Sequence, residues 1–349
     1  MSALAELLAA ARDRRAFSGA AWSVGTAEGP LDRGWTGTGS RGGPALDGDE
    51  LWDLASVTKP VVGLTVMALV EQGALALDHT VGDHLPEYRS SDKSGVTMHQ
   101  LLTHTSGIPG QTPLYRDHPT RPSLLDAVRR LPLTAEPGTR VQYSSAGFIL
   151  LGLIAEAASG EPLDVLVERL VCGPLGMEHT VFRPDAGGRA RAVATEDCPW
   201  RGRVVTGEVH DENAAVLGGI GGHAGLFAPL ADMERLGSAL AAGGRGLLRP
   251  DTFALMTAGH TDELDLRRAL AWQGQDPVDS PVGGSFSPTA FGHTGFTGTS
   301  VWVDPATGRY AVLLTNRVHP TRDGDGITAV RHAFHDEAAT LPAAPRSVS

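Results

Sequence analysis

A serine and a lysine three residues apart, Ser56 and Lys59, are the side chains of this sequence best suited to chemistry. Lysine occurs only twice in the chain, at Lys59 and Lys93, whereas arginine is used freely. Arginine stays protonated at any useful pH, but a desolvated lysine can lose its proton and act as a base. We expect a chain that prefers arginine so strongly to keep lysine where the site needs a base, which arginine cannot be.

Lys59 lies at the start of an apolar segment with helical spacing, residues 60–71, which Gly73 is expected to end. Positions i and i+3 of a helix share a face, so the amine would lie within reach of the Ser56 hydroxyl. The helix N-terminus adds a partial positive field that favours negative charge on oxygen. A weak nucleophile beside a base is what nucleophilic catalysis needs. The alternative is that Ser56 is a helix N-cap and that the spacing arose by chance.

Two further motifs follow in the chain. Residues 141–147 read VQYSSAG and open an apolar helical segment, and residues 292–298 read GHTGFTG and precede a strand-like run. With SVTK at 56–59, this set resembles the serine β-lactamase and penicillin-binding-protein superfamily, in particular the class C β-lactamase branch with its esterase, D-aminopeptidase and transacylase relatives. The flanking stretches LWDLASVTK, LLTHTSGIPG, GGIGGHAGLF and VWVDPATGRYAVLLTN resemble this branch as well, so that the resemblance covers roughly residues 15–340.

The resemblance implies a catalytic role for three side chains. Ser56 matches the acylated nucleophile, and Lys59 matches the lysine that helps to deprotonate it. Tyr143 matches the tyrosine that relays protons to the leaving group and later activates water; otherwise it is a core aromatic with a bonded hydroxyl. The backbone N–H groups of Ser56 and Phe296 would form the oxyanion hole, where donors point at developing negative charge.

The resemblance also implies a set of substrate-binding positions. His223 shares a Gly-rich stretch with Asn213 near the edge of the cleft, where it would contact substrate or assist proton transfer, or would instead be a structural histidine. Gln111 corresponds to a substrate-contacting glutamine once a one-residue gap is allowed. The full implied set is Ser145, His293, Thr294, Gly295, Gln111 and His223.

Two positions depart from the pattern of the family. Ser145 stands where the Tyr-x-Asn element has its amide, and a hydroxyl is shorter and less directional. His293 stands where the Lys-Thr-Gly element has its lysine, so that a titratable group replaces a permanent cation. Penicillins and D-Ala-D-Ala peptides carry a carboxylate that this cation would face. Both changes therefore favour the esterase, amidase or transacylase relatives.

The surrounding pattern predicts an α+β fold. Strand-like runs at 20–24, 51–54, 299–303 and 310–315 lie near the chain ends, with helices at 1–15 and 326–339 and a loop at 274–288. Helical patterns dominate the middle, at 97–104, 145–158 and 232–242. We expect an antiparallel sheet flanked by helices from both termini (residues 1–56 and 275–349), packed against a mostly helical inserted region (57–274). The active site would lie at their junction.

Composition excludes several other classes of protein. The 349 residues carry a formal net charge of -11, which disfavours binding to nucleic acid or to anionic lipid. Two cysteines, Cys172 and Cys198, are too few for a disulfide scaffold or a zinc ribbon, although one bridge stays open. No metal-binding or nucleotide-binding motif is present, so neither a metal nor a cofactor is expected. Glu6 interrupts the first apolar run, which predicts a surface helix rather than a secretory signal and hence a cytoplasmic protein.

The sequence therefore predicts a serine hydrolase that acts through an acyl-enzyme on a small-molecule ester or amide. An acyltransferase or amide synthase that passes the acyl group to an amine or alcohol shares the same covalent step. A D-Ala-D-Ala carboxypeptidase, a β-lactamase and a non-catalytic ligand-binding protein remain further alternatives. Neither the natural acyl group nor the oligomeric state follows from the sequence.

Overall fold

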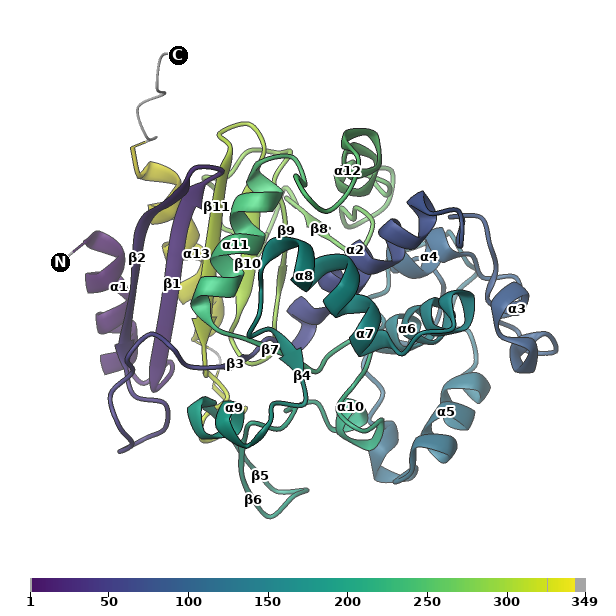
Figure 1. Cartoon of the computed structure of the whole chain (residues 1–349), viewed down its shortest axis with the longest axis horizontal. Helices are drawn as coiled ribbons and strands as arrows, with labels where there is room; N and C mark the ends of the chain where they lie inside the picture. Colours follow the sequence, from purple (N-terminus) through teal and green to yellow (C-terminus); the bar gives the residue numbers. More distant parts are fainter. Residues whose placement is uncertain (1, 325, 343–349) are drawn as a thin grey trace.

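The computed structural model describes residues 2–324 and 326–342, and its largest element is a six-stranded antiparallel sheet (Figure 1). The strand order is β2-β1-β11-β10-β9-β8, so that strands from the two chain ends lie side by side. The strands are β1 (Gly19–Thr26), β2 (Gly29–Gly37), β8 (Gln273–Gly274), β9 (Phe291–Thr294), β10 (Ser300–Asp304) and β11 (Arg309–Thr315). The sheet predicted from both ends of the chain, with its hairpin near residues 299–315, is confirmed.

Alternate residues of each central strand point to opposite faces, and each face is covered by helices. In β11, Ala311 and Leu313 pack with the terminal helices α1 (Ala3–Asp13) and α13 (Ile327–Thr340). Tyr310, Val312 and Leu314 of the same strand join the larger core, which includes α11 (Leu230–Ala241). The central strands are therefore buried on both faces, whereas the edge strand β2 stays partly exposed (Figure 1).

The larger core continues into a helical region around the buried helix α2 (Thr58–Glu71). Helix α6 (Ser145–Ser159) packs beside it, and α4 (Met98–Leu102) packs against α6. The remaining helices are α3 (Val81–His84), α5 (Arg121–Arg130), α7 (Leu163–Val167), α8 (Gly173–Leu175), α9 (Ala186–Arg191), α10 (Glu212–Val216) and α12 (Pro250–Thr257).

The middle of the chain contributes more to the sheets than the sequence predicts. Helix α11 comes from the expected helical region but packs on β1 and β11, and β8 precedes the expected boundary at 274. Two small sheets also form, from β3 (Trp52–Asp53), β7 (Leu226–Ala228) and β4 (Val181–Phe182), and from β5 (Ala194–Cys198) and β6 (Arg203–Thr206). β3 lies within the strand-like run predicted at 51–54. β4 and β7, with two and three residues, are too short to show an alternating pattern. β5 and β6, with five and four residues, were not predicted.

Three further features bear on the sequence-based expectations. Lys93 is fully buried, and its Nζ contacts Asp92 at 2.7 Å and donates to the carbonyls of Arg129 and Leu131, so the second lysine ties α5 to a neighbouring loop. Cys172 and Cys198 are both buried and free, which closes the question of a bridge between them. Among the described residues, no helix combines the length and the apolar character needed to cross a membrane.

Candidate active site

Ser56 lies in a strained turn at the start of α2. The turn is the single 3-10 turn η1 (Ala55–Val57), which runs directly into the helix. Ala55 has a φ of 48°, a left-handed conformation that residues other than glycine rarely adopt. The buried Asp53 carboxylate holds this turn, because Oδ1 accepts the Ala55 N–H at 2.8 Å and Oδ2 accepts the His210 N–H at 2.6 Å. Strain of this kind persists only where the surroundings enforce it.

Lys59 lies directly beside the Ser56 hydroxyl. Its Nζ donates to Ser56 Oγ at 3.1 Å and to the main-chain oxygen of His223 at 3.0 Å. The Lys59 side chain is fully buried, and its Nζ lies 4.7 Å from the centroid of the Tyr143 ring. The i, i+3 spacing therefore brings together the amine and the hydroxyl, and the fold adds the tyrosine.

Tyr143 is positioned by the residues that begin α6. Ser144 caps this helix, because its Oγ accepts the Gly147 N–H at 3.1 Å while it donates to Pro109 O at 2.8 Å. The Ser144 N–H donates to Nδ1 of His104 at 3.0 Å, and the His104 ring packs 4.6 Å from the Tyr143 ring. Burial holds the pKa of His104 well below its usual value, so this imidazole stays neutral and serves as an acceptor.

The turn after β9 is bonded to the nucleophile turn. Thr297 Oγ1 donates to Asp53 O at 2.7 Å, and Thr299 Oγ1 donates to Leu54 O at 2.9 Å. Among the residues that the structure describes, none accepts a hydrogen bond from the Phe296 N–H. This donor is therefore free for a substrate oxygen, as the predicted oxyanion hole requires.

Gly295 allows this close approach, and we expect its replacement to disrupt the site. A Cβ at this position would lie 2.0 Å from Thr299 Oγ1 and 2.5 Å from Leu54 O. Gly295→Ala must push the strand away from the nucleophile turn, so kcat/KM should fall at least about 100-fold, as expected when the reacting groups are displaced by about 1 Å. Gly95→Ala is the control, because a Cβ there meets nothing within 4 Å. Steady-state kinetics of both variants make the comparison, and equal activity would show that the strand position is unimportant.

The structure shows the environment of His293. Its side chain is buried, and its Nδ1 donates to Thr294 O at 2.8 Å. Burial, together with the nearby Lys59 amine, lowers the pKa of His293 to about 3. The imidazole therefore carries no charge near neutral pH, in line with the expectation that no permanent cation stands at this position.

Buried histidines, among them His293 and His335, should make the fold sensitive to acid. Burial also lowers the pKa of His335, whose Nε2 lies 3.1 Å from Ser300 Oγ, to about 3. In the unfolded chain these histidines bind a proton near pH 6.5, but in the folded protein they bind one only near pH 3. Protons therefore favour the unfolded state between these pH values, and the free energy of unfolding falls as the pH drops through this window. Between pH 7 and 5 each histidine should cost about 2 kcal/mol.

Urea unfolding at pH 7 and pH 5 measures this effect. His335→Gln should reduce the loss of unfolding free energy between these two pH values, since the variant lacks one titrating group, while its active site keeps His293. An unchanged pH dependence in His335→Gln would contradict the prediction.

Two cavities open on either side of Ser56, and Ser56, Gln111 and Phe296 line both of them. The first, which we call the loop-side cavity, measures about 260 Å³. The second, which we call the strand-side cavity, measures about 450 Å³. The loop-side cavity is also lined by Ala55, Thr112, Pro113, Tyr115, Arg116, Ser145, His210, Asp211, Glu212, Asn213, Ala224 and Arg322. The strand-side cavity is also lined by Tyr143, Gln273, His293, Thr294, Gly295, Arg317, Gly324, Ile327, Thr328 and Arg331.

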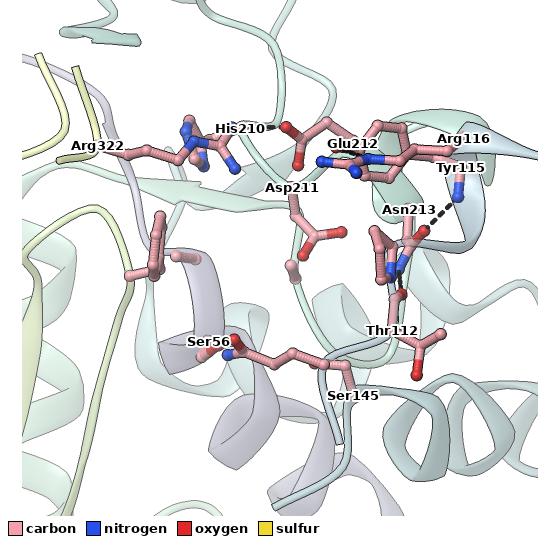
Figure 2. A pocket seen from close by; sticks show the side chains of 15 residues that line it. Ser56, Thr112, Tyr115, Arg116, Ser145, His210, Asp211, Glu212, Asn213 and Arg322 are labelled. Atoms are coloured by element: carbon pink, nitrogen blue, oxygen red, sulfur yellow. Dashed lines mark hydrogen bonds and ion pairs between the residues drawn. The ribbon is translucent and has the colours of Figure 1, made fainter. Parts of the chain in front are cut away.

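Polar contacts hold the wall of the loop-side cavity opposite Ser56 (Figure 2). Asn213 accepts the Tyr115 N–H at 2.9 Å and donates to Thr112 O at 2.8 Å, which fixes the start of α10 to the 112–115 loop. Glu212 pairs with Arg322, which enters from the sheet side and also binds Glu196. Glu196, Glu212 and Cys198 lie close enough together to hold a metal ion, but the Arg322 guanidinium already bridges the two carboxylates.

His223 does not take the predicted substrate-binding place. Its side chain is fully buried, its Nε2 lies 3.0 Å from Asp211 Oδ1, and it lines neither cavity. Its main-chain oxygen instead accepts a hydrogen bond from Lys59, so His223 helps to position the amine through the backbone. The other implied positions, Ser145, His293, Thr294, Gly295 and Gln111, all line one or both cavities.

Sequence reasoning missed Asp53 and the arginines of the cavity walls. The signal for Asp53 was present, since it lies within the LWDLASVTK stretch three residues before Ser56. Nothing comparable marks Arg322 or Arg331, because their partners lie far away in the sequence.

A comparison with protein families matches the Beta-lactamase family model over residues 4–334. The chain therefore belongs to the β-lactamase family, whose members are generally serine hydrolases. It is 31% identical to a putative D-alanyl-D-alanine carboxypeptidase of Escherichia coli K12 in an alignment of 304 residues that covers 77% of this chain and 69% of that protein. It is also 31% identical to an N-acetylmuramyl-L-alanine amidase of Bacillus subtilis over 303 residues, covering 77% and 68% of the two chains.

Solved structures share the same fold. EstCE1, described as a hydrolase with promiscuous acyltransferase activity, superposes with a TM-score of 0.78 at 22% identity over 97% of both chains. A mutant of the simvastatin synthase LovD from Aspergillus terreus superposes with a TM-score of 0.76 at 20% identity, covering 96% of this chain and 93% of that one.

Proposed function

We propose that this protein is a serine hydrolase that forms an acyl-enzyme at Ser56 with a small-molecule ester or amide. The observation that carries the proposal is the buried Lys59 amine, 3.1 Å from Ser56 Oγ and over the Tyr143 ring, at the junction of two cavities. A nucleophile and a base within hydrogen-bond distance are the parts that covalent catalysis requires.

The chemistry proceeds in two steps. Ser56 Oγ attacks the carbonyl carbon, and its proton passes to the Lys59 amine or through it to Tyr143. The N–H groups of Ser56 and Phe296 bind the oxyanion of the tetrahedral intermediate. The C–O or C–N bond then breaks, the leaving group takes up the proton, and water attacks the resulting ester in the second step to release the acid.

The two cavities suit an enzyme whose second step also accepts other nucleophiles. Either cavity can hold the acyl group while the other admits water, an amine or an alcohol. Acyl transfer is therefore a second outcome of the same intermediate. The described activity of EstCE1, which shares the fold, supports including acceptors in the assay.

A D-Ala-D-Ala carboxypeptidase is the second candidate function. The names of relatives with 31% identity favour it, and Arg317 and Arg331 line the strand-side cavity where a substrate carboxylate would need positive charge. The neutral His293 and the short Ser145 hydroxyl favour the ester or amide substrate instead.

We place the protein in the cytoplasm as part of the main proposal.

Intact-mass spectrometry tests the main proposal. The protein is mixed briefly with p-nitrophenyl butyrate and quenched in acid. Its intact mass is then measured, and a digest locates the modified peptide. One butyryl group on the peptide that contains Ser56 is the expected result. Added hydroxylamine or n-butanol would then reveal acyl transfer, and a D-Ala-D-Ala peptide and benzylpenicillin test the carboxypeptidase and β-lactamase alternatives. No adduct and no p-nitrophenol release would favour a ligand-binding protein.

A further inference from the structure

Arg331 in α13 reaches the backbone beside the nucleophile turn. Its Nη2 donates to Gly295 O at 2.6 Å and to Thr299 O at 2.9 Å. Only 9% of this arginine is exposed, so its guanidinium is largely removed from water. The Gly298 N–H also donates to Gly295 O, at 3.0 Å, so two donors hold this one carbonyl.

The carbonyl of Gly295 belongs to the same peptide group as the Phe296 N–H. A peptide group is planar and trans, so its C=O and its N–H point in opposite directions. Fixing Gly295 O from the α13 side therefore fixes the direction of the Phe296 N–H on the other side. That N–H has no acceptor among the residues that the structure describes.

We propose that Arg331 is a positioning residue for the oxyanion hole, because its guanidinium orients and polarises the peptide group that supplies the Phe296 N–H. The inference rests on the proposed acyl-enzyme chemistry at Ser56. Arg331 lies on the far side of the peptide from this N–H and acts through it.

The physical effect has two parts. A hydrogen bond from a cation is shorter and stronger than a neutral one, so it holds the peptide plane firmly. Hydrogen bonds in a chain also polarise one another, so a cation on the carbonyl makes the attached N–H a better donor. Negative charge on the substrate oxygen develops mainly in the transition state, so loss of this effect should lower kcat and leave KM nearly unchanged.

The variants are Arg331→Gln, Arg331→Lys and the control Arg309→Gln. Arg309, the first residue of β11, is another buried arginine that binds backbone carbonyls. It donates to Ala338 O at 3.0 Å and also to Ala339 O, both at the carboxyl end of α13. It lines neither cavity beside Ser56. Arg309→Gln therefore reproduces the loss of stability of the same helix without touching the oxyanion hole.

The measurements are kcat and KM for p-nitrophenyl butyrate, the inhibition constant of phenylboronic acid, and the midpoint of thermal unfolding. Phenylboronic acid forms a tetrahedral anionic adduct with a serine nucleophile and so probes the oxyanion hole. Loss of a whole oxyanion-hole donor costs about 10²–10³ in kcat, so a weakened donor in Arg331→Gln should cost about 10–100-fold. The boronate should bind more weakly by a similar factor, and KM should change less than about 3-fold, as expected for an interaction made only in the transition state.

Arg331→Lys keeps the cation but not the planar fork, so its kcat should fall by an intermediate factor, roughly 3–10-fold. Arg309→Gln should lower the midpoint of thermal unfolding and keep kcat. A folded Arg331→Gln with the kcat and boronate affinity of the wild type would overturn the inference, as would equal losses of kcat in Arg331→Gln and Arg309→Gln. If Arg331→Gln does not fold, a wild-type kcat in Arg331→Lys would overturn it.

The two proposals fail in different ways. If the wild-type protein forms no acyl-enzyme, the proposed function fails and the role of Arg331 fails with it. If the acyl-enzyme forms at Ser56 and Arg331→Gln forms it at the wild-type rate, only the role of Arg331 fails.

Discussion

Ser56→Ala is expected to abolish acyl-enzyme formation and to leave the fold intact. The hydroxyl oxygen is the attacking atom, and the Lys59 amine that would take its proton lies 3.1 Å away. Removal of the nucleophile in other serine hydrolases costs about 10⁶ in kcat, so a fall of at least about 10³ is a conservative expectation. Ser56 is only partly buried, so the substitution creates little cavity and the midpoint of thermal unfolding should stay nearly unchanged.

Two measurements check this prediction. Release of p-nitrophenol under saturating substrate gives kcat, and intact-mass spectrometry shows whether any butyryl group remains attached. Both proteins are purified in the same way, so that a contaminating esterase appears equally in each. Residual turnover above a few per cent of the wild type, or an adduct of unchanged mass on Ser56→Ala, would show that another residue is the nucleophile.

Lys59→Arg is expected to be nearly as damaging as removal of the amine. An arginine in this place keeps its proton at the pH of the assay and cannot accept the one from Ser56. The side chain is fully buried between Ser56 Oγ and His223 O, so the larger guanidinium must also displace its neighbours. We expect kcat to fall at least about 10²-fold, the lower end of what general acid–base catalysis contributes.

The chain offers a matched control for this substitution. Lys93 is the other lysine, is also fully buried and also donates to backbone carbonyls, but it lies away from the cavities beside Ser56. Lys93→Arg should therefore lower the free energy of unfolding through overpacking and leave kcat nearly unchanged. A Lys59→Arg enzyme with a near-wild-type kcat would exclude Lys59 as the base.

The parts of the site that follow from local geometry were predictable from the sequence. The contact between Ser56 and Lys59 depends only on helical spacing, and the hairpin of β10 and β11 depends on two apolar runs and a turn. That strands from both ends of the chain share one sheet followed from the strand-like runs there, although the particular pairing of β1 with β11 did not. In each case the interaction that forms the structure is short in sequence or is encoded in a strong pattern.

The parts that depend on contacts between distant segments were not predictable. The spacing within α13 gives no sign that Arg331 reaches Gly295 O, because nothing in the sequence fixes where the helix packs. The charge on His293 depends on how deeply it is buried, which a strand pattern does not reveal. The main-chain oxygen of His223 accepts a hydrogen bond from Lys59, and a contact of this kind cannot be predicted from the type of side chain at position 223.

The order of strands in the large sheet has a consequence for biosynthesis. β1 pairs with β11, and the nucleophile turn is bonded to Thr297 and Thr299, almost 250 residues later in the chain. A ribosome must therefore complete nearly the whole polypeptide before these contacts can form. Pairings between such distant segments fold slowly, because the loop between them must be closed first. When Ser56, Lys59 and Tyr143 have left the ribosome but the last strands have not, the nascent chain should contain its nucleophile and still be unable to form the acyl-enzyme.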